Sequence, residues 1–221
     1  MINPNFCFVT GVPGSSWSML SHRLKLILNH DLSDINGSRH HLAPHRDPTQ
    51  DTNRTHLGSY FGPYNEFGER FDDIPNNYTL ESFYNECRLP FNHDDGQTKC
   101  IRSHWFSYNL DWLWENCKGN TLFLIHKESQ GAIDWWEKIG GWNIKYPVYT
   151  WYENNEKITR QIIEENNSLL RFAKEKNLKW ETYCEEWWLE KFGREEITQT
   201  NRPPAVEYNV NKISVIYTEI T

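Results

Sequence analysis

Residues 6 to 18, FCFVTGVPGSSWS, carry the pattern that most restricts the fold: a short apolar run, a loop rich in glycine, proline and serine, and the start of a helix. The apolar residues 6 to 9 predict a buried strand, and residues 10 to 16 predict a loop. From Ser16 onward, apolar residues follow at helical spacing: Met19, Leu20, Leu24, Ile27 and Leu28. Strand, loop and helix in this order are typical of the units that build parallel α/β sheets.

The rest of the chain repeats this alternation. Periodicity predicts helices over 79–89, 107–117, 129–139, 152–176 and 185–193, the second of them capped by Ser107. It predicts strands over 99–105, 121–125 and 178–183, and the β-rich segment 205–220 is expected to add an edge strand or hairpin. We therefore expect one three-layer α/β/α domain over residues 1–221, with a mainly parallel central sheet and a long polar loop insertion at about 30–66.

Charge and cysteine content exclude several classes of protein. A formal charge of −7 and a pI near 5.7 leave no basic surplus for nucleic acid or an anionic membrane surface. The five cysteines include no CxxC pair, which is typical of a reduced, cytoplasmic chain and argues against thiolate zinc. No secretory leader and no run of about 20 apolar residues is found, so we expect a soluble cytoplasmic protein; its oligomeric state stays open.

The loop at 10 to 16 raises the question of phosphate binding. A Walker A loop ends in Gly, Lys and Ser or Thr, whereas counting from Gly11 places Ser16, Trp17 and Ser18 there. Without the lysine, transfer of a phosphoryl group from ATP is poorly supported. Loop amides and a helix N-terminus can still bind an anion, so the candidate binding residues are Gly11, Val12, Pro13, Gly14, Ser15, Ser16, Trp17 and Ser18.

TGVPGSSWS resembles the first loop of the sulfotransferases, which runs like G-x-P-[RK]-S-G-[ST]-[ST]. The matches are Gly11, Pro13, Ser15 and Ser18, while Gly14 stands where a basic residue is usual and Trp17 where Ser or Thr is usual. The order of this and the later segments, and stretches such as HLGSYFGPYNEFG, make the chain similar to the compact sulfotransferase-like proteins of marine bacteriophages.

The resemblance implies a P-loop NTPase-like topology and 3′-phosphoadenosine-5′-phosphosulfate (PAPS) as co-substrate. It also implies a small-molecule, glycan or peptide acceptor with a hydroxyl or amine, and no metal. A phage origin would place the protein in the host cytoplasm.

Two later segments extend the resemblance. Arg102, Ser103 and His104 follow a predicted strand, where the family has a Lys-Thr-His-like segment; His104 would be the general base and Arg102 would stabilise the sulfuryl oxygens. In LFLIHKESQGAIDWW, Lys127 or His126 stands at the place of an Arg that binds the nucleotide 3′-phosphate. In the family a serine on the next helix follows that arginine, and its place in this chain falls on Asp134 or Trp135. An aspartate at this place would repel the phosphate.

The segment LKWETYCEEWWLEKFG resembles a structural signature of the family, a strand, an acidic residue and a helix. The adjacent tryptophans at 135 and 136, and at 187 and 188, point to opposite sides of their helices, so one of each pair is expected in the core and the other against a neighbouring element or ligand.

Several alternatives remain open on the sequence alone. His104 is equally well interpreted as a packing histidine and Lys127 as a solvated charge. His40, His41, His45 and His56, with Asp47 and Asp51, have no metal-ligand spacing and fit an anion or acceptor pocket better than a metal site; Glu66 is a weaker candidate base. At the level of function, the alternatives are a degenerate relative that binds or assembles without catalysis, and a nucleoside or nucleotide kinase.

Overall fold

The computed structural model of the chain describes residues 5–36, 74–91, 96–138, 154–193 and 212–221. Its strands are β1 (Phe6–Gly11), β2 (Lys99–Arg102), β3 (Thr121–Lys127), β4 (Glu181–Thr182) and β5 (Ile213–Glu219). Its α-helices are α1 (Trp17–Ile27), α2 (Ile74–Asn77), α3 (Leu80–Arg88), α4 (Leu110–Asn116), α5 (Ser129–Lys138), α6 (Asn155–Glu175) and α7 (Glu185–Phe192), and its 3₁₀ helices include η1 (Ser33–Asn36) and η4 (His104–Tyr108). Among these residues, no helix combines the length and apolar character needed to cross a bilayer.

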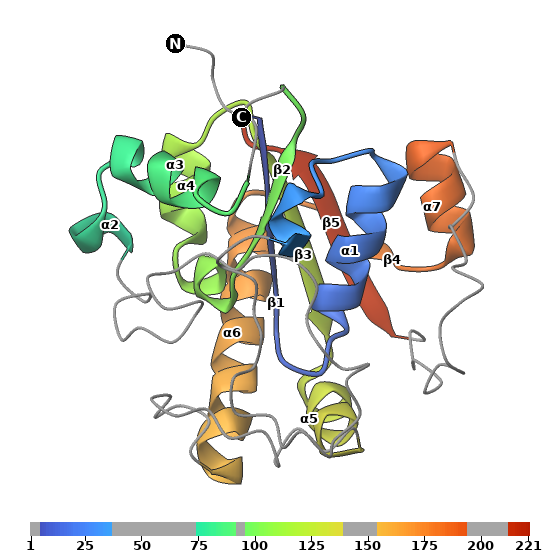
Figure 1. The fold of residues 1–221 in the computed structure, drawn as a ribbon. Helices are drawn as coiled ribbons and strands as arrows, with labels where there is room; N and C mark the ends of the chain where they lie inside the picture. The colour runs from blue at the N-terminus through green and yellow to red at the C-terminus, as the bar shows by residue number, and fades with distance from the viewer. Residues whose placement is uncertain (1–4, 37–73, 92–95, 139–153, 194–211) are drawn as a thin grey trace.

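The strands form one open mixed sheet with the order β2-β1-β3-β5-β4 (Figure 1). β1 pairs in parallel with β2 and with β3, as the alternation of strands and helices predicts. β5 pairs antiparallel with β3 and with β4, so it lies inside the sheet and the expectation of an edge strand was wrong. The edge strands are β2 and β4, and β4 keeps only two residues of the strand predicted over 178–183. The α/β class is confirmed. The expectation of a mainly parallel sheet was wrong, because β5 adds antiparallel pairings on both of its sides. A P-loop topology stays a prediction.

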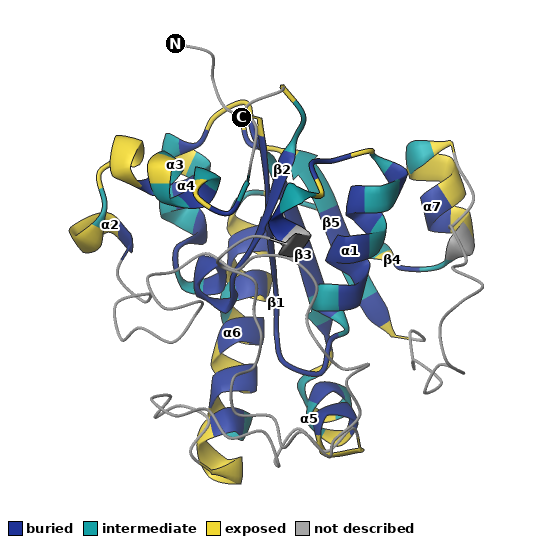
Figure 2. Ribbon diagram, in the orientation of Figure 1, coloured by how far each residue is buried: buried dark blue, intermediate teal, exposed yellow. Residues whose placement is uncertain are grey.

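Helices cover both faces of the sheet because the side chains of β1 alternate between them. Phe6 and Phe8 belong to one apolar cluster, which also contains residues from α3, α4 and α6. Cys7 and Val9 belong to a second cluster with residues from α1 and α7. Figure 1 shows these two groups of helices on opposite sides of the sheet, and Figure 2 shows every residue of β1 in the buried colour.

One predicted cap was wrong. Ser107 does not begin the helix predicted over 107–117: it lies in η4, where its hydroxyl donates to the backbone oxygen of His104 at 2.6 Å. The capping serine of this region is Ser103, whose side chain accepts from the N–H of Trp105 at 3.1 Å. η4 therefore begins directly after β2, and α4 starts later, at Leu110.

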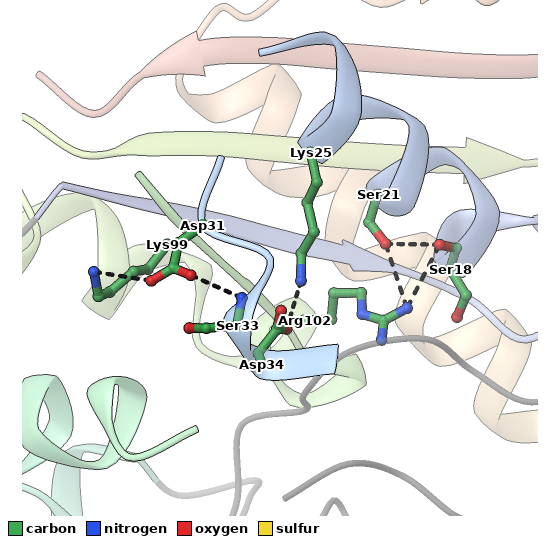
Figure 3. Close-up of polar contacts among 8 residues, drawn as sticks. All are labelled: Ser18, Ser21, Lys25, Asp31, Ser33, Asp34, Lys99 and Arg102. Atoms are coloured by element: carbon green, nitrogen blue, oxygen red, sulfur yellow. Dashed lines mark hydrogen bonds and ion pairs between the residues drawn. The ribbon is translucent and has the colours of Figure 1, made fainter. Parts of the chain in front are cut away.

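Buried ion pairs fasten the end of α1 and the following segment to β2 (Figure 3). Lys25 of α1 pairs with Asp34 of η1 at 2.5 Å, and Lys99 of β2 pairs with Asp31 at 3.3 Å. All four residues are 4% exposed or less. Burial by itself raises the pKa of Asp31, but hydrogen bonds from Ser33 and the Lys99 ammonium outweigh it, so the pKa is lowered from its ordinary value.

We predict that Asp31→Asn lowers the free energy of unfolding by about 2 kcal/mol at pH 7, because a charge-assisted contact inside the protein is lost. A carboxylate with a lowered pKa contributes stability above its unfolded pKa of about 3.9 and loses it as the pH falls through the folded pKa. The difference between wild type and variant should therefore shrink in urea titrations below about pH 4. The control is Asp111→Asn. The Asp111 side chain pairs with Arg171 but is 44% exposed, so its replacement should lower the free energy of unfolding by less than about 1 kcal/mol. A difference that does not change with pH would contradict the prediction.

Candidate functional site

Three chain segments meet at the carboxyl edge of the parallel strands. They are the loop after β1, η4 after β2, and the residues at the end of β3. Val9 pairs with Arg102, the last residue of β2, and Gly11, the last residue of β1, pairs with Ile125, so the three strands end at the same edge of the sheet in a staggered order. The helix after β1, α1, packs in the cluster that contains Val9. The helix after β3, α5, packs with Val12 and with α6, and α6 also lies in the cluster that contains Phe8. In open α/β sheets, this is where ligands bind.

The loop closes through a tight turn over residues 12–15. The N–H of Ser15 donates to the Val12 oxygen at 3.1 Å, with Pro13 at the second position and Gly14 at φ +81° in the third, which are the features of a type II turn. The Ser15 hydroxyl donates to the same oxygen at 2.7 Å. The Ser15 side chain therefore stabilises the loop itself, which differs from its predicted contact with a phosphate.

The N-terminus of α1 has two features that also occur at anion-binding sites of other proteins. Ser16 precedes the helix at φ 62° and makes no side-chain cap. The first N–H groups of a helix have no acceptor within the helix, and they carry the positive end of its dipole. The left-handed conformations of Gly14 and Ser16, on either side of Ser15, turn successive amides in a way that occurs in anion-binding nests.

Lys127 lies against this loop. Its Nζ donates to the Gly14 oxygen at 3.3 Å and stands 5.3 Å from the ring centre of Trp135, and the residue is 2% exposed. Burial lowers the pKa of Lys127. The interpretation of Lys127 as a solvated surface charge is therefore wrong. Lys127 contacts the loop that was predicted to hold the 5′ end of the nucleotide.

Arg102, the last residue of β2, contacts the first turns of α1. Its Nη1 is 3.5 Å from the Ser18 oxygen and 3.5 Å from the Ser21 hydroxyl, and the residue is fully buried (Figure 3). Arg102 and Ser18, predicted from separate segments, thus come together at the first turn of α1. A guanidinium in this position adds positive charge to the helix N-terminus.

His104 completes the arrangement. Its ring centre is 4.4 Å from that of Trp17, the first residue of α1, so the imidazole lies next to the predicted loop residues. His104 Nδ1 is 3.3 Å from Oε2 of Glu165, a fully buried residue of α6; the two atoms lie within ion-pair distance but outside hydrogen-bond geometry. The other oxygen of Glu165 accepts from Gln161 Nε2 at 2.6 Å. His104 is therefore a buried histidine with a carboxylate partner, beside an N-terminal helix end.

Glu165 was missed in the sequence, although a signal was present. Ile158, Ile162 and Leu169 form the apolar stripe of α6, and Gln161 and Glu165 fall on the same buried face. A carboxylate on such a stripe needs a partner, because burying an unpaired charge costs several kcal/mol. The partner lies 61 residues earlier in the chain, and helical periodicity alone gives no indication of it.

The remaining candidates contribute less. Among the described residues no group of three His, Cys, Asp or Glu could hold a metal ion, and His40, His41, His45, His56, Asp47, Asp51 and Glu66 lie outside these residues. Asp134 is exposed and accepts from Gln130 Nε2 at 2.7 Å. Both residues of each tryptophan pair are buried, and they pack on neighbouring elements.

We predict that Gly14→Ala strongly destabilises the protein. A Cβ at Gly14 would stand 2.0 Å from the Ala132 oxygen, and alanine is also strained at φ +81°. The free energy of unfolding should fall by about 3 kcal/mol or more in urea titration. Gly96→Ala is the control: φ is +80° there and nothing lies within 4 Å, so only the backbone strain of about 1 kcal/mol applies. Equal losses of unfolding free energy in the two variants would contradict the prediction, because the close approach of Gly14 to α5 would then add nothing to the backbone strain.

Comparison of the chain with protein-family models, with curated proteins and with solved structures gave no match. A proposal about function therefore rests on the residues described above.

Proposed function

We propose that the protein is a sulfotransferase-like enzyme with a P-loop-like topology, which transfers a sulfuryl group from PAPS to a hydroxyl or amine. The observation that carries the proposal is the convergence at α1: an N-terminus without a side-chain cap, the Arg102 guanidinium at its first turn, and His104 in ring contact with Trp17. An anion site with a base beside it is what transfer of an anionic group to a hydroxyl requires.

The residues fit the phosphosulfate end of the nucleotide better than its 3′-phosphate. Amides of the α1 N-terminus, with Ser16 and Ser18 beside them, would hold the 5′-phosphate. For the 3′-phosphate the resemblance offered Lys127, whose ammonium instead donates to the Gly14 oxygen. We therefore assign Lys127 to the support of the loop, and recognition of the 3′-phosphate to none of the described residues.

The proposed reaction is an in-line transfer. The bond between sulfur and the bridging oxygen of the nucleotide breaks, a bond forms between sulfur and the acceptor oxygen or nitrogen, and the acceptor's proton passes to His104. Arg102 supplies positive charge near the sulfuryl oxygens. No metal takes part in this proposal, and the acceptor is a small molecule, a glycan or a peptide.

A second candidate function is binding or assembly without catalysis. Two specific contacts favour it: the Ser15 hydroxyl and the Lys127 ammonium both donate to carbonyls of the loop itself, so these donors are used within the protein. A kinase is less favoured, because Trp17 stands where a phosphate loop has its lysine and packs on His104.

Titration with 3′,5′-adenosine bisphosphate tests the nucleotide site. We expect heat in calorimetry and, at 100 times the dissociation constant, stabilisation of the folded state by about 2.7 kcal/mol. Adenosine 5′-phosphate is the matched ligand: equal affinity for both would show that the 3′-phosphate is not recognised. No heat and no thermal stabilisation at millimolar bisphosphate would remove the proposal and leave the binding or assembly protein.

Replacement of His104 tests its role as base. His104→Asn keeps a nitrogen donor close to the position of Nδ1, so Glu165 stays paired, but it removes Nε2. We expect turnover to fall by roughly 10²-fold, with bisphosphate affinity and melting temperature nearly unchanged. His104→Ala should in addition lose about 3 kcal/mol of stability, because the Glu165 carboxylate is then buried without its partner. Unchanged turnover in His104→Asn would exclude His104 as the general base.

A further inference from the structure

Glu165 and its neighbours form a polar network between α6 and η4. Gln161 and Glu165 are four residues apart on α6, and His104 and Tyr108 are four residues apart on η4. Gln161 Nε2 lies 2.6 Å from Glu165 Oε1 and 2.6 Å from the Tyr108 hydroxyl, while Glu165 Oε2 lies 3.3 Å from His104 Nδ1. Each oxygen of the carboxylate thus faces a different nitrogen.

The burial of this network determines what it can do. Glu165 is 0% exposed, and a carboxylate removed from water is stabilised only by donors or positive charge. A neutral imidazole can offer one N–H, and Nδ1 is the nitrogen that faces Glu165. A proton on Nδ1 places its positive hydrogen on the side of the ring that faces the carboxylate, at an Nδ1–Oε2 distance of 3.3 Å, and leaves the lone pair of the ring on Nε2.

We propose that Glu165 is the positioning residue of the site: it holds His104 in the Nδ1–H tautomer, so that Nε2 accepts the acceptor's proton. The proposal rests on the proposed function, in which His104 is the base. Once the proton has moved to Nε2, the carboxylate also stabilises the imidazolium that forms. Of the described residues, Glu165 from α6 faces His104, and Tyr108 from η4 joins the network through Gln161. Arg102 stands two residues before His104 at the end of β2 and contacts α1.

Glu165→Gln tests this because Gln161 would orient the new amide. Gln161 Nε2 donates to the position of Oε1, so the carbonyl oxygen of the new glutamine should stay there. Its NH₂ group then takes the position of Oε2 and faces Nδ1, which favours the opposite tautomer, with the proton on Nε2. The control is Glu164→Gln on the same helix, since Glu164 is 47% exposed and pairs with Arg160.

The tautomer is measured on the full chain labelled with ¹⁵N-histidine, by two-bond ¹H–¹⁵N correlation at a pH where the rings are neutral. The His104 signals are identified by their loss in His104→Asn. We expect Nδ1–H in wild type and in Glu164→Gln, and Nε2–H in Glu165→Gln. Turnover with PAPS should fall at least about 10-fold in Glu165→Gln with little change in KM, because the wrong nitrogen carries the proton.

Two results would overturn the inference: an Nε2–H tautomer in wild type, or an Nδ1–H tautomer retained in Glu165→Gln. If Glu165→Gln does not fold, the tautomer of His104 in wild type still tests the inference. A wild-type Nδ1–H tautomer that inverts in Glu165→Gln supports the pairing whether or not sulfuryl transfer is found. Absence of both bisphosphate binding and sulfuryl transfer in wild type would overturn the proposed function, and with it the assignment of Nε2 as base.

Discussion

β1 is paired in parallel on both sides and buried at each of its residues, and the rest of the structure depends on this constraint. A strand enclosed by two ladders and two apolar layers cannot shift its register by one residue without exchanging Phe6 and Phe8 for Cys7 and Val9. The position of Gly11 is therefore determined, and with it the start of the loop. A Cβ on Gly11 would stand 2.8 Å from Trp17 Cβ and 2.9 Å from the Ile125 oxygen, so the chain must leave the sheet through a glycine.

The elements that local patterns determine could be predicted, and the contacts between distant segments could not. The apolar runs of β1 and β3 and the stripe of α6 were visible in the sequence because burial requires them. The place of β5 between β3 and β4 was not, since a β-rich terminal segment has the same pattern at an edge as inside a mixed sheet. Ser107 was misassigned because a serine caps a turn or bonds back to it with equal ease.

The candidate site shows the same division. The loop, Arg102 and His104 were found because they follow predicted strands, and the carboxyl ends of parallel strands meet. The partners that change their chemistry come from elsewhere: Glu165 from α6, and the Gly14 oxygen for Lys127. The sequence therefore identified residues that could bind an anion or accept a proton, while the structure shows which of these groups already contact one another. Arg102 and Lys127 both contact backbone oxygens, and they come from β2 and β3, the strands on either side of β1.

The contact between Gly14 and Ala132 has a mechanical consequence. The backbone of the loop lies directly against the backbone of α5, and Lys127 at the end of β3 joins the two by contacting both the Gly14 oxygen and the ring of Trp135. The loop and α5 are therefore packed backbone against backbone at this point, where no side chain can change its rotamer to make room. A ligand that needs more room at Gly14 would have to displace α5 as well, and binding that requires such a rearrangement is slower than docking to a preformed surface.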